Sequence, residues 1–359
     1  MKILIFADAR SIHTRRWAEA LRDKGHSIYI ATFREQAIEG VNVYVVGKNV
    51  LGKLGYLSSL GELKLLYKNI KPDIVHAHYA TSYGVIAAFA NLHPLIITAW
   101  GSDVLISPKK SFLSRILLRY AFKHADSVTC VADHMIEPII ELGCKREKVR
   151  SITMGIDIDD YPIEMDKKPV PPPYRIISTR GFEKIYDVST LLEAGYILYK
   201  QGVDIRIILV GTGSLENALE RKAVDLGIKQ IVSFEGKVSF SKLKELLGSS
   251  HFFVSTSISD GNNISLNEAM VLGCYPIATD IAANRQWIQH GLNGLLYKCS
   301  DAVELAEMIK KGISSIEGYT DIAQSNRKMV IEKASWNNCV VQMNKLYESI
   351  LNYPKGKEK

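Results

Sequence analysis

The chain has 359 residues, of which 47% are hydrophobic and 23% charged, and its formal net charge is +7. Its length suits two domains better than one, and this composition is that of a soluble globular protein. No stretch of 18 uncharged apolar residues occurs, and the apolar N-terminal run ends at Asp8, so we expect neither a membrane span nor a signal peptide. The positive charge suits an anionic ligand or membrane surface but is too weak and dispersed to indicate nucleic acid.

The five cysteines are scattered singly along the chain and lack the spacing of a metal site. An odd number of isolated cysteines argues against a disulfide scaffold and for a reducing compartment. We therefore expect a cytoplasmic protein without a zinc site.

In the first half, Ile- and Val-rich runs alternate with helical patterns. Runs of this kind, flanked by helices, indicate a parallel sheet that is covered on both faces, which is a doubly wound domain. The predicted strands are 2–7, 27–32, 73–78, 94–100 and 127–131, with helices over 15–24 and 133–142.

The alternation pauses at 167–174, KKPVPPPY, where four prolines in five residues hold the backbone extended. It then resumes as a second α/β half and closes with a helix. The predicted strands are 175–179, 205–210, 231–236, 251–255, 274–279 and 294–297, with helices over 188–200, 215–226, 241–247 and 336–353. We expect domains at 1–167 and 168–335, and a C-terminal helix, 336–359, that packs back on the first domain.

Ligands of open α/β sheets bind at the carboxyl ends of the strands. The fold class that we expect is therefore α/β, with two doubly wound, Rossmann-like domains whose strand ends face each other across a cleft.

A polar loop between the strand at 251–254 and a helical pattern at 264–272 is the strongest candidate for a ligand site. The loop ends at Asn263 and places unpaired backbone N–H groups at a helix N-terminus, which favours a phosphate. Two acids, Asp260 and Glu268, bracket this position. Glu268 lies among apolar residues, so its carboxylate needs a partner, and a ligand hydroxyl is a natural one.

Two further loops follow strands of the second half and should reach the same sheet edge. One carries Arg180 and Lys184, which could neutralise a pyrophosphate. The other contains Gly211 and Gly213, whose lack of a side chain lets backbone approach a ligand. Each signal is weak by itself, since an Arg with a Lys in a loop is more often solvated surface; their coincidence at one edge strengthens them.

In these residues and in those around them, the chain resembles the retaining, family-4 (group 1) glycosyltransferases of the GT-B type. The text from Asp260 to Asp280, DGNNISLNEAMVLGCYPIATD, is similar to the E-x7-E region of that family, and HGLNGLLY at 290–297 matches a later segment. Weaker similarities in DIVHAHY, ITAWGSD and MGID extend the resemblance over nearly the whole chain.

The resemblance implies a donor site for a nucleotide-diphosphate sugar. Glu268 would hold the ribose hydroxyls, and Asp260, in place of the usual Glu, would accept a hydrogen bond from the sugar. Arg180 and Lys184 would stabilise the leaving diphosphate, so that no metal or other cofactor is needed. The remaining donor-binding residues would be Gly213, Gly236, Val238, Asn262, Asn263, Ile264 and Ser265.

The acceptor side departs from the family pattern. Trp100 stands where many relatives have a histidine. The role of that histidine would pass to Asp103 or to His13. Ser11, His13 and Arg15 lie in the loop after the first strand, where anion contact and an ordinary capped helix start are both open. His78, at the end of another strand, is either an acceptor-side residue or a structural histidine.

A basic amphipathic helix covers the region around 111–124. The residues Arg115, Arg119 and Lys123 fall on one side, and a second side carries Phe112, Leu113, Ile116, Leu117 and Tyr120. The favoured interpretation is a helix whose apolar side packs on the sheet. Contact with an anionic membrane surface is the alternative.

The function that we expect is metal-independent, retaining transfer of a sugar from a UDP- or GDP-sugar to a glycan or lipid-linked acceptor, in surface polysaccharide or glycoconjugate synthesis. A sugar-nucleotide epimerase of the same fold and a catalytically silent nucleotide-sugar-binding partner are the alternatives. A dinucleotide oxidoreductase is disfavoured, because the first strand–loop–helix lacks a glycine-rich fingerprint.

Overall fold

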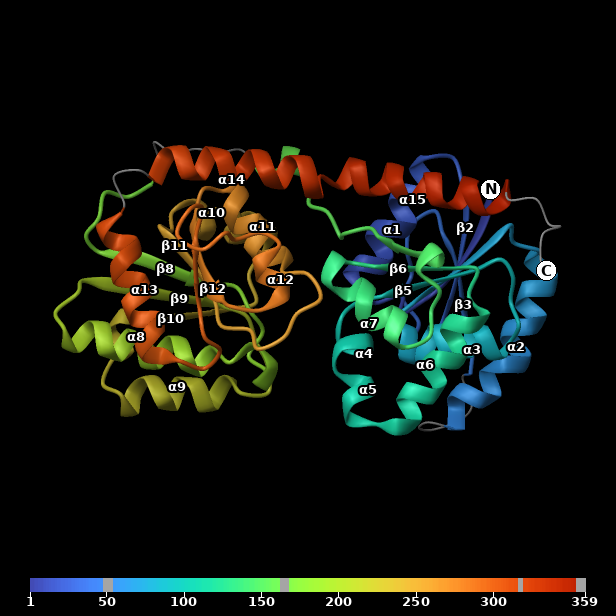
Figure 1. The fold of residues 1–359 in the computed structure, drawn as a ribbon, viewed down its shortest axis with the longest axis horizontal. Helices are drawn as coiled ribbons and strands as arrows, with labels where there is room; N and C mark the ends of the chain where they lie inside the picture. The colour runs from blue at the N-terminus through green and yellow to red at the C-terminus, as the bar shows by residue number, and fades with distance from the viewer. Residues whose placement is uncertain (48–53, 162–167, 316–318, 353–359) are drawn as a thin grey trace. The chain divides into compact units, whose positions relative to one another are not determined.

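The computed structural model describes residues 1–47, 54–161, 168–315 and 319–352. The chain forms two compact units, one of Met1–Met154 with Asn337–Lys359 and the other of Gly155–Trp336 (Figure 1). The second unit thus begins before the proline-rich stretch. The reason is that Ile156 pairs with Ser335 through a parallel bridge and Tyr161 is buried in the core of the second unit.

The first unit is built on a seven-stranded sheet in the order β3-β2-β1-β4-β5-β6-β7, and all neighbouring strands are parallel. Its strands are β1 (Lys2–Phe6), β2 (Ser27–Thr32), β3 (Asn42–Val45), β4 (Ile74–His78), β5 (Leu95–Ala99), β6 (Ser127–Cys130) and β7 (Val149–Ser151). Every residue of β4, β5 and β6 is buried, which explains their continuous apolar runs.

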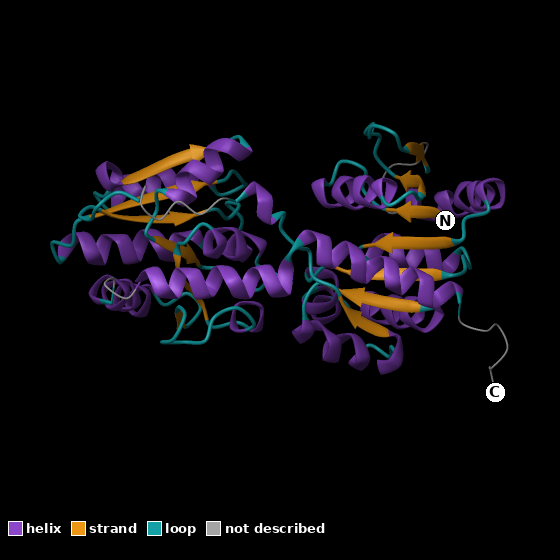
Figure 2. Ribbon diagram, turned by 90° about the horizontal axis from the view of Figure 1, so that it is seen from above, coloured by secondary structure: helices purple, strands orange, loops and turns teal. Residues whose placement is uncertain are grey.

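Helices lie on both sides of this sheet (Figure 2). They are α1 (Ile12–Asp23), α2 (Leu54–Ile70), α3 (Val85–Phe89), α4 (Ser102–Leu105), α5 (Ser107–Lys110), α6 (Phe112–His124), α7 (Ile136–Glu141) and α15 (Trp336–Leu351). The C-terminal helix α15 is held by a hydrogen bond of 2.7 Å between Tyr347 Oη and His76 Nδ1, and Tyr347 is fully buried. The end of the chain therefore completes the first unit.

The second unit has a six-stranded parallel sheet in the order β10-β9-β8-β11-β12-β13. Its strands are β8 (Tyr174–Ser178), β9 (Ile205–Val210), β10 (Val232–Gly236), β11 (Phe252–Ser255), β12 (Tyr275–Thr279) and β13 (Leu295–Tyr297). Its helices are α8 (Val188–Lys200), α9 (Glu216–Asp225), α10 (Phe240–Gly248), α11 (Ile264–Val271), α12 (Ala282–Arg285), α13 (Ala302–Ser314) and α14 (Tyr319–Ala334).

Short helical turns occur in both units. They lie at Ala80–Gly84, Asp133–Met135, Arg146–Lys148, Ile158–Asp160, Lys184–Tyr186 and Lys229–Ile231.

Consecutive residues of the second sheet enter two separate cores. Phe252 joins the cluster on one face and Phe253 the cluster on the other, and Ile176 and Ile177 divide in the same way. Because side chains alternate across a strand, a sheet with two cores needs apolar residues at every position. This confirms the expected pair of doubly wound α/β units.

None of the helices in the described residues combines the length and the apolarity that crossing a bilayer requires. All five cysteines are free, and four of them are buried.

Candidate active site

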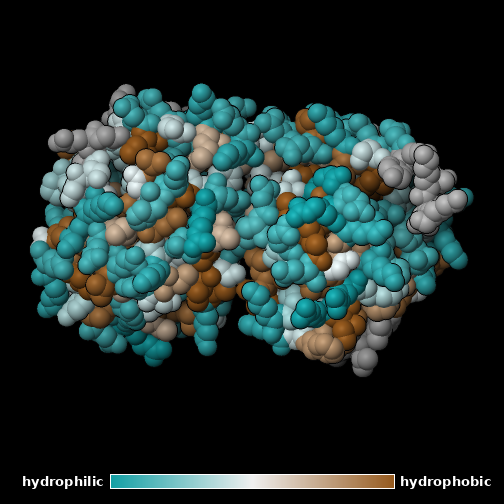
Figure 3. All heavy atoms as spheres, viewed as in Figure 1, coloured by the Kyte–Doolittle hydropathy of each residue, from teal (hydrophilic) through white to brown (hydrophobic). Residues whose placement is uncertain are grey.

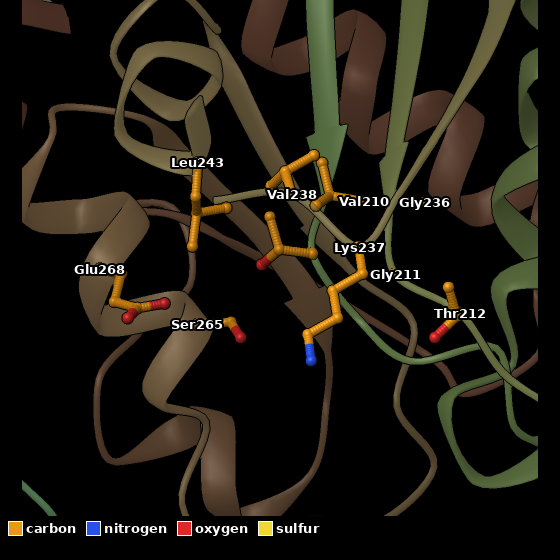
Figure 4. A pocket seen from close by; sticks show the side chains of 10 residues that line it. Val210, Gly211, Thr212, Gly236, Lys237, Val238, Leu243, Ser265 and Glu268 are labelled. Carbon is orange, nitrogen blue, oxygen red and sulfur yellow. The ribbon is translucent and has the colours of Figure 1, made fainter. Parts of the chain in front are cut away.

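A pocket of about 190 Å³ opens at the carboxyl ends of β8, β9 and β10 in the second unit, beside the start of α11 (Figure 4). It is lined by Thr179, Val210, Gly211, Thr212, Gly236, Lys237, Val238, Leu243, Ser265 and Glu268. Parallel strands end at the same edge of a sheet, so loops far apart in sequence meet here. Four of the expected donor-site residues, Gly236, Val238, Ser265 and Glu268, line this pocket.

The pocket combines an apolar wall with one carboxylate and one cation. Val210, Val238 and Leu243 form the wall. Figure 4 shows Glu268 and Ser265, from α11, on one side, and Lys237 with Thr212 toward the other. Lys237 was missed by the sequence analysis, although it directly follows β10 and the strand-end argument applies to it as it does to Arg180.

Glu268 is oriented by a residue from the start of the second unit. Tyr161 Oη donates a hydrogen bond of 2.7 Å to Glu268 Oε1. The ring of Tyr161 packs edge-on against Phe240, and its carbonyl oxygen accepts a hydrogen bond from Arg327. Tyr161 is thus fixed at both ends, and it holds one carboxylate oxygen of Glu268 in place.

Arg180 and Asp260, expected to contact different parts of a ligand, are paired with each other. The Nη2 of Arg180 lies 2.5 Å from Asp260 Oδ2, and the two side chains are only 9% and 15% exposed. Arg180 Nη1 donates to Asn263 Oδ1 at 3.0 Å, and the guanidinium carbon stacks 4.4 Å from the centre of the Tyr186 ring. The structure therefore joins the loops after β8 and β11 through a nearly buried ion pair.

The two asparagines before α11 serve the loop itself. Asn263 caps α11, because its Oδ1 accepts from the N–H of Leu266, and its Nδ2 donates to Ser255 and Asn284. Asn262 Oδ1 accepts from the indole N–H of Trp287. These side chains shape the helix start. We therefore expect the contacts of this segment with the sugar donor to be made by backbone groups.

Backbone groups of Asn262 and Ile264 are also hydrogen-bonded within the protein. The N–H of Ile264 donates to the carbonyl oxygen of Asn262 at 3.0 Å. Neither residue lines the pocket, whereas the next residue, Ser265, does.

Gly213 has a structural reason that differs from the expected one. A Cβ atom at Gly213 would lie 2.5 Å from the carbonyl oxygen of Phe182, and one at Gly211 would lie equally close to that of Arg180. The glycines let the loop after β9 pack against the backbone after β8. This packing accounts for a glycine at position 213, and the ligand contact of Gly213 stays a prediction.

Lys184 is exposed in a short turn, Lys184–Tyr186, on the loop that carries Arg180. It does not line the pocket.

In the first unit, the carboxyl ends of β1, β4 and β5 bring together two histidines and a tryptophan. The rings of His13 and Trp100 stack with centroids 4.9 Å apart, and His78 lies 5.7 Å from Trp100. His78 is 4% exposed, and neither of its ring nitrogens has a hydrogen-bond partner among the described residues. The three side chains form what we call the His–Trp cluster.

Both imidazoles of the His–Trp cluster are neutral at physiological pH. Burial, together with the positive charge of Arg16, lowers the pKa of His13 to about 4. Burial, together with the nearby His13, lowers the pKa of His78 to about 3. A neutral imidazole offers one donor and one acceptor and no charge, so this cluster is suited to hydroxyl groups.

Asp103 is not placed to act on a substrate. It is fully buried, and its carboxylate accepts hydrogen bonds from the backbone N–H groups of Ala80, Trp100 and Gly101. Burial raises its pKa against the lowering effect of these bonds. The expectation of a catalytic Asp103 is therefore corrected: it holds the loop that presents Trp100.

The remaining residues of this edge divide into structural and exposed ones. His76, beside His78 in sequence, is hydrogen-bonded through both nitrogens, to Tyr347 and Thr98. Ser11 is the N-cap residue of α1 without a side-chain capping bond, and Arg15 is exposed on the first turn of that helix.

Comparison with known proteins agrees with this geometry. Residues 2–132 match the family model described as glycosyl transferase 4-like, and residues 162–329 match that of the glycosyl transferases group 1. Both models describe glycosyltransferases and together they cover most of the chain, which is thus a GT4-type glycosyltransferase. The enzyme is 26% identical over 314 residues to an uncharacterised glycosyltransferase of Methanocaldococcus jannaschii, which covers 86% of this chain and 80% of the relative.

Two further likenesses bear on activity and fold. A putative colanic acid biosynthesis glycosyltransferase of Escherichia coli, WcaL, is 24% identical over 194 residues, 52% of this chain and 48% of that one. The crystal structure of Anabaena HepE in complex with UDP and glucose superposes with a TM-score of 0.81, at 20% identity, over 97% of this chain and all of that one. The enzyme thus has the GT-B fold.

We expect Asp260→Asn to lower the free energy of unfolding by about 3 kcal/mol, because it leaves the guanidinium of Arg180 buried without a counter-charge. Urea-induced unfolding followed by circular dichroism measures this. Lys184→Ala, which removes an exposed cation from the same loop, should change stability by less than about 0.5 kcal/mol. Equal stability of the Asp260 variant and the wild type would show that the pair does not hold the loops.

The lowered pKa of His78 predicts a loss of stability in acid. The imidazole is protonated near pH 6.5 in the unfolded state but only near pH 3 in the folded state. The contribution of neutral His78 to the free energy of unfolding is therefore complete above pH 6.5 and decreases below it. Between pH 6.5 and 4.5 the wild type should lose about 2 kcal/mol more than His78→Asn. Parallel stability curves of the two proteins would contradict the buried neutral imidazole.

Proposed function

We propose that the enzyme transfers a sugar from a nucleotide-diphosphate sugar, with retention at the anomeric carbon, to a glycan or lipid-linked acceptor during surface polysaccharide or glycoconjugate synthesis. The observation that carries the proposal is the pocket of the second unit, where the oriented carboxylate of Glu268 lines the same cavity as an apolar wall and the cation Lys237. The UDP and glucose bound to HepE and the polysaccharide pathway named for WcaL are consistent with it.

The pocket suits the nucleoside end of the donor. Glu268 would accept hydrogen bonds from the two ribose hydroxyls, and Tyr161 keeps its carboxylate turned for this. Val210, Val238 and Leu243 offer apolar surface to a base, either uracil or guanine. The first turn of α11 at Ser265 and the ammonium of Lys237 favour the diphosphate.

Arg180 would act on the leaving group. Its charge is already desolvated and fixed by Asp260 and Asn263, so it needs little reorganisation when negative charge develops on the diphosphate. Lys184, on the same loop, would add a second cation. We propose that these cations serve in place of a metal, that Asp260 also accepts from a sugar hydroxyl, and that the leaving phosphate serves as the base.

The His–Trp cluster would receive a hydroxyl-rich group on the acceptor side. Trp100 presents an aromatic face, and His78 has two unpaired nitrogens beside it. Ser11 and Arg15 lie at the start of the same helix as His13. We propose that the enzyme works in the cytoplasm.

Removing Glu268 and Arg180 should affect different steps. We expect Glu268→Gln to weaken UDP or GDP binding by about 10- to 100-fold, because charged hydrogen bonds to ribose are lost. Arg180→Lys should lower kcat by about 100-fold while nucleotide affinity changes by less than about threefold. Calorimetry and a donor-consumption assay measure the two.

The same measurements separate the alternatives. Nucleotide-sugar binding by the wild type without turnover on any acceptor would support the silent partner, and release of an epimerised sugar would support the epimerase. Unchanged kcat in Arg180→Lys would remove Arg180 from the leaving-group role.

Tyr161→Phe should weaken nucleotide binding by about tenfold, because the variant loses the hydrogen bond that orients Glu268 but keeps the ring against Phe240. Unfolding should change by no more than about 1 kcal/mol. Calorimetric titration with UDP and GDP is the measurement, and Tyr199→Phe, at an exposed tyrosine of α8, is the control. An effect on stability alone would show that Tyr161 serves packing and not the ligand.

A further inference from the structure

The first two turns of α6 expose large apolar side chains on the first unit. Phe112 is 78% exposed, Leu113 63% and Ile116 46%. We call the segment from Ser107 to Lys123, with these side chains at its centre, the α5–α6 tip. Single exposed apolar residues are ordinary on protein surfaces, but three within two turns of one helix form a patch.

The favoured interpretation of this helix was wrong for these three residues. The face of α6 that packs on the unit consists of Leu118, Ala121 and Phe122, all buried. Phe112, Leu113 and Ile116 lie on the outer face, and Leu117 and Tyr120 are half-buried at its border. Burial of the helix therefore does not account for its outer apolar residues.

The outer patch continues onto a neighbouring helix. The Tyr120 ring stacks on Phe89 of α3 with centroids 4.5 Å apart, and Phe89 is itself exposed. Phe112, Ile116 and Tyr120 are four residues apart, so they follow one ridge of the helix.

Cations surround this ridge. Arg115, Arg119 and Lys123 follow the adjacent ridge, and Lys109 and Lys110 end α5 just before it; all five are exposed. No acidic residue occurs in the sequence between Asp103 and Asp126. Figure 3 shows hydrophobic and hydrophilic side chains side by side over the lower part of the first unit, where Figure 1 places α5 and α6.

The N-terminus of α6 adds to the positive potential. Ser111 caps the helix, with its Oγ accepting from the N–H of Ser114 at 3.3 Å, so the helix starts at the tip. The positive end of the helix dipole is thus presented beside Phe112 and the two lysines.

We propose that the α5–α6 tip is a docking surface for an anionic lipid bilayer. The aromatic and aliphatic side chains enter the interface between head groups and acyl chains, and the flanking lysines and arginines meet lipid phosphates. Charge complementarity selects this occupant, because a segment with five cations and no acid suits a surface of uniform negative charge. The contact does not depend on the transfer reaction.

Co-sedimentation of the full-length enzyme with vesicles tests the proposal. Vesicles of phosphatidylcholine alone are compared with vesicles in which roughly one lipid in three is phosphatidylglycerol. We expect binding to the anionic vesicles only, and weaker binding as salt is raised.

Two variants and two matched controls give the test its specificity. Phe112→Ser with Leu113→Ser should reduce vesicle affinity by about tenfold or more, and so should Arg115→Glu with Arg119→Glu. The controls carry the same kinds of change at exposed sites of the second unit: Leu292→Ser with Val303→Ser, and Lys310→Glu with Lys311→Glu. They should bind as the wild type does.

Each other outcome overturns the proposal. Equal binding to neutral vesicles, equal losses in the controls, or tip variants that still bind would exclude a specific anionic lipid surface. A change of oligomeric state in the tip variants, with no vesicle binding by the wild type, would assign the patch to contact between copies. Nucleotide affinity is measured on every variant and shows that each is folded. If the wild type itself bound no nucleotide, that result would contradict the transferase proposal alone.

Discussion

A guanidinium that is withdrawn from water needs a counter-charge and hydrogen-bond acceptors, and Arg180 obtains both from a single loop. Asp260 supplies the charge and Asn263 an acceptor, while the ring of Tyr186 covers one face. Asn263 simultaneously caps α11. The position of the helix start, and hence of Ser265 and Glu268 in the pocket, therefore depends on the side chain of Arg180. Binding geometry and stability are coupled at this point, and a substitution that removes one charge of the pair disturbs both, whereas a Lys at position 180 keeps the charge.

The two units solve the electrostatics of their strand ends in different ways. The second unit keeps a charged arginine in place with a carboxylate, whereas the first keeps two imidazoles uncharged by burying them. A fixed cation favours developing negative charge, and a neutral imidazole favours hydroxyl groups. Each unit by itself is thus suited to one chemical kind of ligand: the second unit to a phosphate-bearing ligand and the first to a hydroxyl-bearing one.

The sequence predicted the elements whose pattern depends only on burial. Strands such as β4 and β11 are buried at every position and appear as continuous apolar runs. The edge strand β3, which is at most half-buried, and the helices α2, α13 and α14 were not identified. An edge strand lacks the apolar run that marks a buried strand. The missed helices did not affect the prediction of the ligand site, because that prediction depends on where the strands end and not on the helices that connect them.

Details of the site that depend on tertiary contacts could not be read from the sequence. Tyr161 and Glu268 are 107 positions apart, and nothing local links them. Gly213 and Asp103 have residue types that suit a ligand site, yet their neighbours are backbone groups of the protein itself. Lys237 was predictable, because it directly follows a strand at the edge already singled out.

The position of α15 fixes the order in which the enzyme can be completed during synthesis. His76 waits for Tyr347, 271 residues later, whereas the second unit is one continuous segment whose ends are already joined where Trp336 donates a backbone hydrogen bond to Ile156. The unit that begins first on the ribosome is thus the last to close. Until α15 emerges, the central strands of that unit have a buried histidine without its partner, and a truncation that removes α15 leaves the N-terminal unit unfinished.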